Sequence, residues 1–252
     1  MKVIFLGTGS SAGTPAIACH CPVCCSVDPR NHRLRASILV QDGGTNLLVD
    51  TGPDLRQQML RAGVQVLSAV LYTHFHADHI NGVDDLRAFN FAQKIVIPCH
   101  ADERTAIELE TRFRYCFLPP DITWAKPSLA MHRIASPQTF GGVEVTPIPV
   151  LHGQLPILGY RFNDVAYLTD LKTIPDSSLM LLQGLKVLIL DCLHYAEHPA
   201  HLNVEEALYW ARRIDAERTI FTHMTHDVDY ATLAAELPET VIPAYDGMVV
   251  DL

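Results

Sequence analysis

Residues 73–79 carry three histidines and one aspartate close together, at His74, His76, Asp78 and His79. The motif follows the apolar residues 69–72, which predict a β-strand, so it lies on the loop after that strand. Burying these polar side chains is costly unless they share a cation. Imidazoles and carboxylates together suit zinc, manganese or iron. His74 and His76 alternate as on an extended chain and point the same way, whereas Asp78 and His79 fall at a helix start and can face a second metal.

Three more candidate ligands follow apolar segments elsewhere in the chain: His152, Asp170 and His223. Taken singly, such a residue is more often a hydrogen-bonded surface group, just as a lone histidine in residues 73–79 would be a solvated loop residue. Together with the first motif they supply five histidines and two aspartates. That set is large enough to hold two metal ions.

A second kind of metal site is predicted by the spacing Cys19-x-Cys21-x-x-Cys24. Three thiolates this close need one more ligand to complete a tetrahedral zinc site. His226, three residues after His223, is the candidate, and His20 is an alternative. Four free cysteines in a reducing compartment, with Cys25 included, are the competing interpretation. If His226 is the fourth ligand, one short loop serves both metal sites.

Composition limits the class of protein. The chain has 252 residues, 48% of them hydrophobic and 19% charged, which suits one domain over residues 1–252. No apolar run approaches the ~20 residues of a membrane span, and the short apolar start does not resemble a secretory signal, so we expect a cytoplasmic protein. With 19 basic and 28 acidic residues the net charge is −9, which argues against nucleic-acid binding.

Short apolar segments alternate with helical patterns along the chain. Strands are predicted at residues 2–6, 36–40, 46–49, 69–72, 94–97, 143–147, 159–162, 165–168, 186–190 and 218–221. Helices are predicted at residues 54–62, 82–90, 102–114, 177–183 and 204–214, the last with Asn203 and Glu206 as a capping box. Residues 98–140 outside the predicted helix look irregular and contain Pro119, Pro120 and Trp124; they either shape a pocket or only connect elements. Two sheets with helices outside, an α/β sandwich, would pack this pattern.

The ordered set of His74, His76, Asp78, His79, His152, Asp170 and His223 resembles the metallo-β-lactamase superfamily, as does the segment 47–52 that contains Asp50. The resemblance implies a four-layer αββα sandwich. It also implies that His74, His76 and His152 bind one metal, that Asp78, His79 and His223 bind the other, and that Asp170 bridges them. Asp50 would support the ligands without touching a metal, and we group it with Asp78 among the catalytic candidates.

The cysteine run with His226 resembles, more narrowly, the structural zinc site of the PhnP family of cyclic phosphodiesterases in phosphonate catabolism. His201 falls where those enzymes carry a catalytic histidine, although the local match is looser there and requires a gap. The resemblance implies two active-site divalent metals (manganese or zinc), one structural zinc, a small phosphorylated substrate and a homodimer.

The resulting hypothesis is a metal-dependent phosphodiesterase in which a hydroxide bridging the metals attacks phosphorus. His201 would protonate the leaving group or bind the phosphate, unless it is a plain loop histidine. Arg33 and Arg35 could bind a terminal phosphate or form a solvated basic loop. The nearest substrate by resemblance is 5-phosphoribosyl 1,2-cyclic phosphate. Alternatives are a transfer-RNA 3′-end endonuclease, a thioesterase or lactonase, and a non-catalytic accessory protein like that of pyrroloquinoline quinone biosynthesis.

Overall fold

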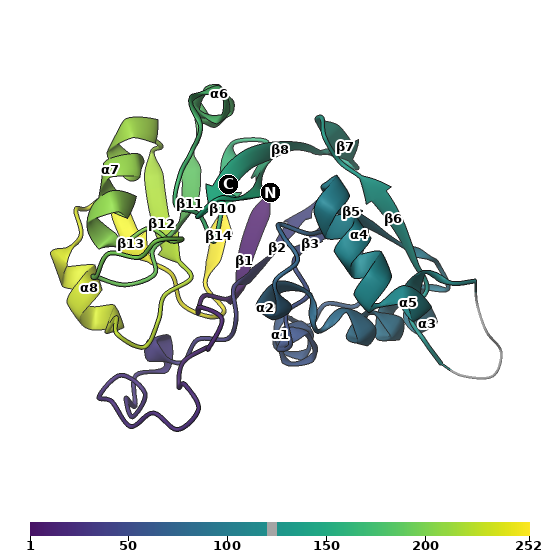
Figure 1. The fold of residues 1–252 in the computed structure, drawn as a ribbon, viewed down its shortest axis with the longest axis horizontal. Helices are drawn as coiled ribbons and strands as arrows, with labels where there is room; N and C mark the ends of the chain where they lie inside the picture. The colour runs from purple at the N-terminus through teal and green to yellow at the C-terminus, as the bar shows by residue number, and fades with distance from the viewer. Residues whose placement is uncertain (120–124) are drawn as a thin grey trace.

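Two seven-stranded β-sheets form the centre of the computed structural model, which describes residues 1–119 and 125–252 (Figure 1). The first sheet has the strand order β14-β1-β2-β3-β4-β5-β6. Its pairs are antiparallel from β14 to β3 and parallel from β3 to β6. The strands are β1 (Lys2–Gly7), β2 (Ser37–Asp42), β3 (Thr45–Val49), β4 (Ala69–Leu71), β5 (Ile97–Ala101), β6 (Leu129–Arg133) and β14 (Val249–Asp251).

The second sheet has the order β13-β12-β11-β10-β9-β8-β7 and repeats the same arrangement. Its pairs are parallel from β13 to β10 and antiparallel from β10 to β7. The strands are β7 (Gln138–Phe140), β8 (Val143–His152), β9 (Leu155–Phe162), β10 (Val165–Leu168), β11 (Val187–Asp191), β12 (Arg218–Thr222) and β13 (Val241–Pro243).

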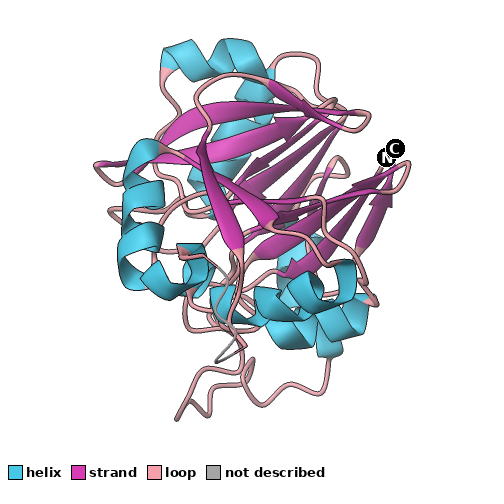
Figure 2. Cartoon of the chain, turned by 90° about the vertical axis from the view of Figure 1, so that its right-hand side faces the viewer, coloured by secondary structure: helices cyan, strands magenta, loops and turns pink. Residues whose placement is uncertain are grey.

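Helices cover the outer faces of both sheets, as the side view in Figure 2 shows. The first sheet carries α1 (Leu55–Ala62), α2 (Ala77–Ile80), α3 (Arg87–Gln93), α4 (Glu103–Arg112) and α5 (Arg114–Phe117). The second carries α6 (Asp176–Leu179) and α7 (Val204–Ile214), and α8 (Tyr230–Glu236) packs beside β13. Short 3-10 turns lie at Pro29–Asn31, Val83–Leu86 and Met180–Leu182. The expected four-layer αββα sandwich is confirmed.

Strand alternation explains this layering. In β1, Val3 and Phe5 lie in the core between the sheets, whereas Leu6 lies in the core under the helices. Successive side chains of a strand point to opposite faces, so a strand with apolar residues at every position must be covered on both sides. β11 meets this condition because all five of its residues are buried. None of the helices in the described ranges is long and apolar enough to cross a membrane.

Most predicted elements lie where the sequence placed them, and residues 98–140 are the main correction. α7 matches its predicted bounds, and its capping box is present because Asn203 and Glu206 exchange hydrogen bonds. The predicted strand at 94–97 was placed too early, since β5 begins at Ile97. The helix predicted at residues 102–114 forms as α4, but the rest of this segment, predicted to be irregular, contains β6 and β7 as well as α5. Pro120 and Trp124 lie outside the described residues.

Candidate metal centre

The predicted ligands converge at one edge of the sandwich, where several strands end. His74 and its neighbours follow β4, and His152 is the last residue of β8. Asp170 and His223 come after β10 and β12, and both have left-handed backbone conformations, with φ of 57° and 62°. Asp50, after β3, has a φ of 64°. Such conformations are uncommon for non-glycine residues and recur at active sites.

The first ligand group consists of His74, His76 and His152, whose ligand atoms lie within 4.8 Å of one another. His74 Nε2 is 3.1 Å from His76 Nδ1. The Nδ1 of His152 donates to the Ala200 carbonyl at 2.9 Å, which leaves its Nε2 free as a ligand. Burial lowers the pKa of all three imidazoles. They are therefore held in the neutral form that a metal requires.

The second group consists of Asp78, His79, Asp170 and His223, again within 4.8 Å of one another. His79 Nε2 is 3.2 Å from an Asp78 oxygen and 3.3 Å from an Asp170 oxygen. Although burial opposes the charge, Asp170 and Asp78 raise the pKa of His79 well above its ordinary value. The surrounding carboxylates thus make this position favourable for positive charge.

Unsatisfied buried atoms test whether a cation fits this group. Among the described residues, the Nε2 atoms of His79 and His223 are buried and have no hydrogen-bond partner of acceptable geometry. Buried polar atoms normally have such a partner. Both atoms point at the carboxylates of the same group, and His223 Nε2 is 3.0 Å from Asp170. A divalent cation among them would satisfy all of these atoms, so the residues fit a metal.

Asp170 lies between the two groups. One of its oxygens is 3.0 Å from His223 Nε2 and 4.0 Å from His74 Nε2. The other is 3.3 Å from His79 Nε2. Asp170 is therefore the carboxylate within reach of both groups, the position that a bridging ligand requires.

Asp50 lies directly behind the second group. It is fully buried and lies 2.8 Å from the Nδ1 of His79. It also accepts hydrogen bonds from the backbone N–H and the hydroxyl of Thr73, each at 2.8 Å. This carboxylate fixes the imidazole so that its Nε2 faces the metal position, the usual arrangement for a metal-binding histidine.

Asp191, the last residue of β11, is a site residue that we did not predict. It accepts hydrogen bonds from the backbone N–H groups of Leu202 at 2.9 Å and Asp170 at 3.2 Å. One of its oxygens also lies 3.3 Å from His223 Nδ1 and 3.4 Å from His201 Nδ1. The signal was available, because Asp191 ends a fully apolar strand just as Asp50 does.

His201 joins the edge of the metal cluster from the loop before α7. Its ring stacks on His223 with centroids 4.9 Å apart and meets the edge of His152 at 4.5 Å. It is 9% exposed, so it lies at the boundary between the cluster and solvent. Because Nδ1 faces Asp191, the Nε2 atom is the one available to a substrate.

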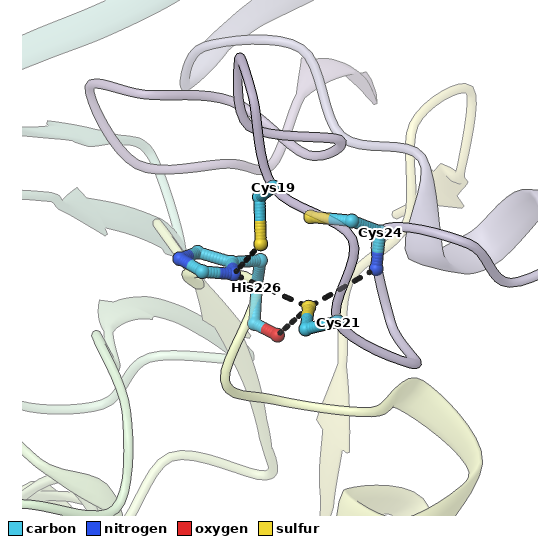
Figure 3. Close-up of side chains that lie close together, drawn as sticks. All are labelled: Cys19, Cys21, Cys24 and His226. Carbon is cyan, nitrogen blue, oxygen red and sulfur yellow. Dashed lines mark hydrogen bonds between the residues drawn. The ribbon is translucent and has the colours of Figure 1, made fainter.

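The structure brings Cys19, Cys21, Cys24 and His226 together (Figure 3). The Sγ atoms of Cys19 and Cys21 are each 3.3 Å from His226 Nδ1, and Cys24 completes a group whose ligand atoms lie within 4.8 Å of one another. The Cys24 backbone N–H, and then His226, lower the pKa of Cys21 to about 6, whereas burial raises that of Cys24 to about 11. His20 is outside this group in the described part of the chain.

One short loop connects the two sites. His223 lies in the buried cluster and His226 lies three residues later in the cysteine site. Between them, Met224 donates to Thr8 at 3.0 Å and accepts from Ser10 at 3.2 Å. The loop is therefore fastened to the N-terminal segment that leads to the cysteines.

The comparisons with known proteins agree with this geometry. A family model described as a beta-lactamase superfamily domain matches residues 45–224, well over half of the sequence. The chain belongs to the metallo-β-lactamase superfamily. Members of this superfamily share the αββα fold seen here, so the expectation drawn from the histidine motif is confirmed.

Individual relatives place the chain near the PhnP family within the metallo-β-lactamase superfamily. The crystal structure of a diphosphatase from the PhnP family has a TM-score of 0.92 and 39% identity, covering 99% of this chain and 97% of that chain. An octanoyltransferase from Porphyromonas gingivalis is 35% identical over 256 residues, 98% of this chain but 51% of that protein. The chain thus spans about half the length of this relative. A ribonuclease Z from Mycobacterium sp. strain KMS is 28% identical over 258 residues, 88% of this chain and 84% of that protein.

The structure corrects our expectation for Arg33. Its side chain is buried, with 1% exposure, and donates to the backbone carbonyls of Thr225 and Val228 at 3.0 and 2.8 Å. A further bond to Asn31 at 3.1 Å directs the guanidinium into the protein, away from any substrate. Arg33 therefore holds the loop that carries His226. Arg35 pairs with Asp54 at 3.0 Å and is partly exposed, and its role in binding phosphate stays a prediction.

Proposed function

We propose that this metallo-β-lactamase-fold hydrolase is a phosphodiesterase that uses two divalent metals, manganese or zinc, and acts on a small cyclic phosphodiester. The supporting observation is that one carboxylate, Asp170, lies within reach of two separate ligand groups, with His201 at their edge. 5-Phosphoribosyl 1,2-cyclic phosphate, from phosphonate catabolism, is the substrate that we propose.

In this proposal His74, His76 and His152 hold one metal, and Asp78, His79 and His223 hold the other. When bound, such a pair supplies charge stabilisation for phosphoryl oxygens and a water of lowered pKa. The chain positions ligands of both groups, because Asp50 orients His79 at 2.8 Å, Asp191 lies 3.3 Å from His223, and the Ala200 carbonyl lies 2.9 Å from His152 Nδ1. Fixed ligands hold the reacting groups in one orientation, which favours in-line attack at phosphorus.

His201 is proposed to donate a proton from Nε2 to the leaving oxygen. Its Nδ1 lies 3.4 Å from Asp191, and a carboxylate at that position favours a ring with a proton on Nδ1 and fixes the ring orientation. The stacked ring of His223 and the edge-on ring of His152 restrict its rotation. His201 is thus held with its free nitrogen at the edge of the cluster.

The cysteine group is proposed to hold one structural zinc. Three thiolates and one imidazole form a closed tetrahedral set with no position left for substrate. A metal there would join the N-terminal segment to the loop after β12, which also carries His223.

The function is tested by a panel of linear and cyclic phosphodiesters after reconstitution with manganese or zinc. Hydrolysis of bis(p-nitrophenyl) phosphate and of the cyclic ribose phosphate is expected, and His201→Ala should slow hydrolysis of the ester with the poorer leaving group more strongly. An enzyme that is fully loaded with metal but inactive on every phosphodiester would contradict the proposal.

A second candidate is the hydrolysis of a diphosphate linkage, which the similarity to a diphosphatase of the PhnP family favours. The chemistry at phosphorus is the same, but the leaving group is a phosphate. Including a diphosphate diester in the substrate panel distinguishes phosphodiesterase activity from diphosphatase activity. RNA cleavage is disfavoured by the net charge of −9. Including a precursor transfer RNA among the substrates would detect it.

A further inference from the structure

Helix α4, which packs on the first sheet, has one flank with glutamates and one flank with arginines. On one flank Glu103 and Glu110 contact Arg133 of β6, at 3.4 and 2.7 Å. On the other flank, Arg104 and Arg112 lie over Phe75 in the loop of residues 73–76 after β4, which we call the metal loop. Residues four or eight positions apart share a helix face, so these arginines form one basic edge.

Phe75 connects this basic edge with the metal ligands. The guanidinium carbon of Arg104 lies 5.0 Å from the centre of the Phe75 ring, and that of Arg112 lies 5.4 Å away. Phe75 meets the ring of His76 edge-on, with centroids 5.5 Å apart. Only one phenyl ring therefore separates the guanidinium of Arg104 from a ligand of the first metal group.

The two arginines differ in how their donors are used. Arg112 donates to the Phe75 carbonyl at 3.0 Å and pairs with Glu108 at 2.9 Å, so it anchors the metal loop. Arg104 has neither an ion pair nor a hydrogen bond within residues 1–119 and 125–252. It is exposed and held only against the Phe75 ring. Its five N–H donors are therefore available to a ligand.

We propose that Arg104 determines specificity by binding a second phosphoryl group of the substrate, while the phosphodiester lies at the metals. A planar guanidinium binds phosphate through two parallel hydrogen bonds, and stacking on Phe75 orders it in advance. This inference rests on the proposed function and adds to it the residue, Arg104, that would select phosphodiesters that also carry a phosphomonoester.

The test compares two substrates that differ only in the distal group, ribose 1,2-cyclic phosphate with and without a 5-phosphate. The wild-type enzyme should prefer the phosphorylated substrate. Arg104→Ala should lower this preference in kcat/KM at least about tenfold, the effect of losing a hydrogen bond to a charged group. The loss should appear in KM, and Arg104→Lys should restore part of it. Arg133→Ala, on the opposite flank of α4, is the matched control and should keep the wild-type preference.

A preference within twofold of wild type in Arg104→Ala would overturn the inference. If the wild-type enzyme hydrolyses neither cyclic substrate, the proposed function fails, and calorimetry with ribose 5-phosphate on metal-loaded protein still tests Arg104. Weaker binding in Arg104→Ala but not in Arg133→Ala would support the subsite. Equal affinity in all three proteins, or no binding to wild type, would refute it.

Discussion

Replacing Asp191 with asparagine should weaken metal binding without unfolding the protein. One oxygen of Asp191 faces Leu202 N–H, and the other faces Asp170 N–H and the Nδ1 atoms of His201 and His223. Whichever way the new amide turns, its NH2 group faces at least one of these donors. Leaving a buried donor without an acceptor costs about 1–3 kcal/mol. Loss of a residue that orients a metal ligand typically lowers affinity or activity about 10–100-fold, which is about 1.4–2.7 kcal/mol.

Metal affinity would be measured by competition with a chromophoric chelator, together with kcat on bis(p-nitrophenyl) phosphate. Asp246→Asn is the matched control, because Asp246 is also a buried carboxylate but contacts Thr8, Leu34 and Arg61 rather than a proposed ligand. We expect the affinity to fall in Asp191→Asn only. If Asp191→Asn keeps wild-type affinity and a kcat within twofold of wild type, Asp191 does not orient His223 and His201.

Two further variants separate stability from catalysis. Cys21→Ala should remove one metal per chain and lower the melting temperature while part of the activity remains, measured by elemental analysis and thermal unfolding; unchanged metal content would contradict a zinc at this site. Arg33→Ala removes three hydrogen bonds of a buried cation and should destabilise the protein by at least about 1.5–3 kcal/mol, the contribution of one hydrogen bond to a charged group. The partly exposed pair of Arg35 with Asp54 should contribute at most about 1 kcal/mol, so equal losses in Arg33→Ala and Arg35→Ala would refute this assignment.

The fold could be predicted where strands are fully apolar or helices carry a clear stripe. β11 and α7 are of this kind, because the sequence of apolar residues in each predicts which side chains are buried. The short strands β7, β13 and β14 have three residues each, too few for a period to show. β6 contains His132 and Arg133 at the edge of its sheet, so it lacks the apolar alternation of a central strand.

The metal site could be predicted in its ligands but less well in its surroundings. Histidines and aspartates at the ends of predicted strands can be recognised as candidate ligands from the sequence, and the structure brings them together. Arg33 and Arg35 look alike in the sequence, yet their environments differ because Thr225 and Val228, far along the chain, supply the carbonyls that bind Arg33. The position of Asp191 at the end of an apolar strand was visible in the sequence, but its role was not, because its partners come from three separate loops.

Anomalous diffraction from crystals loaded with manganese tests the central claim most directly. We predict two ions about 3.5–4 Å apart, one bound by His74, His76 and His152, the other by Asp78, His79 and His223, with Asp170 touching both. His76→Ala and Asp78→Ala crystals should each lose density at the corresponding position and lose hydrolytic activity. A single ion in fully loaded wild-type crystals, or two ions too far apart to share Asp170, would contradict the account.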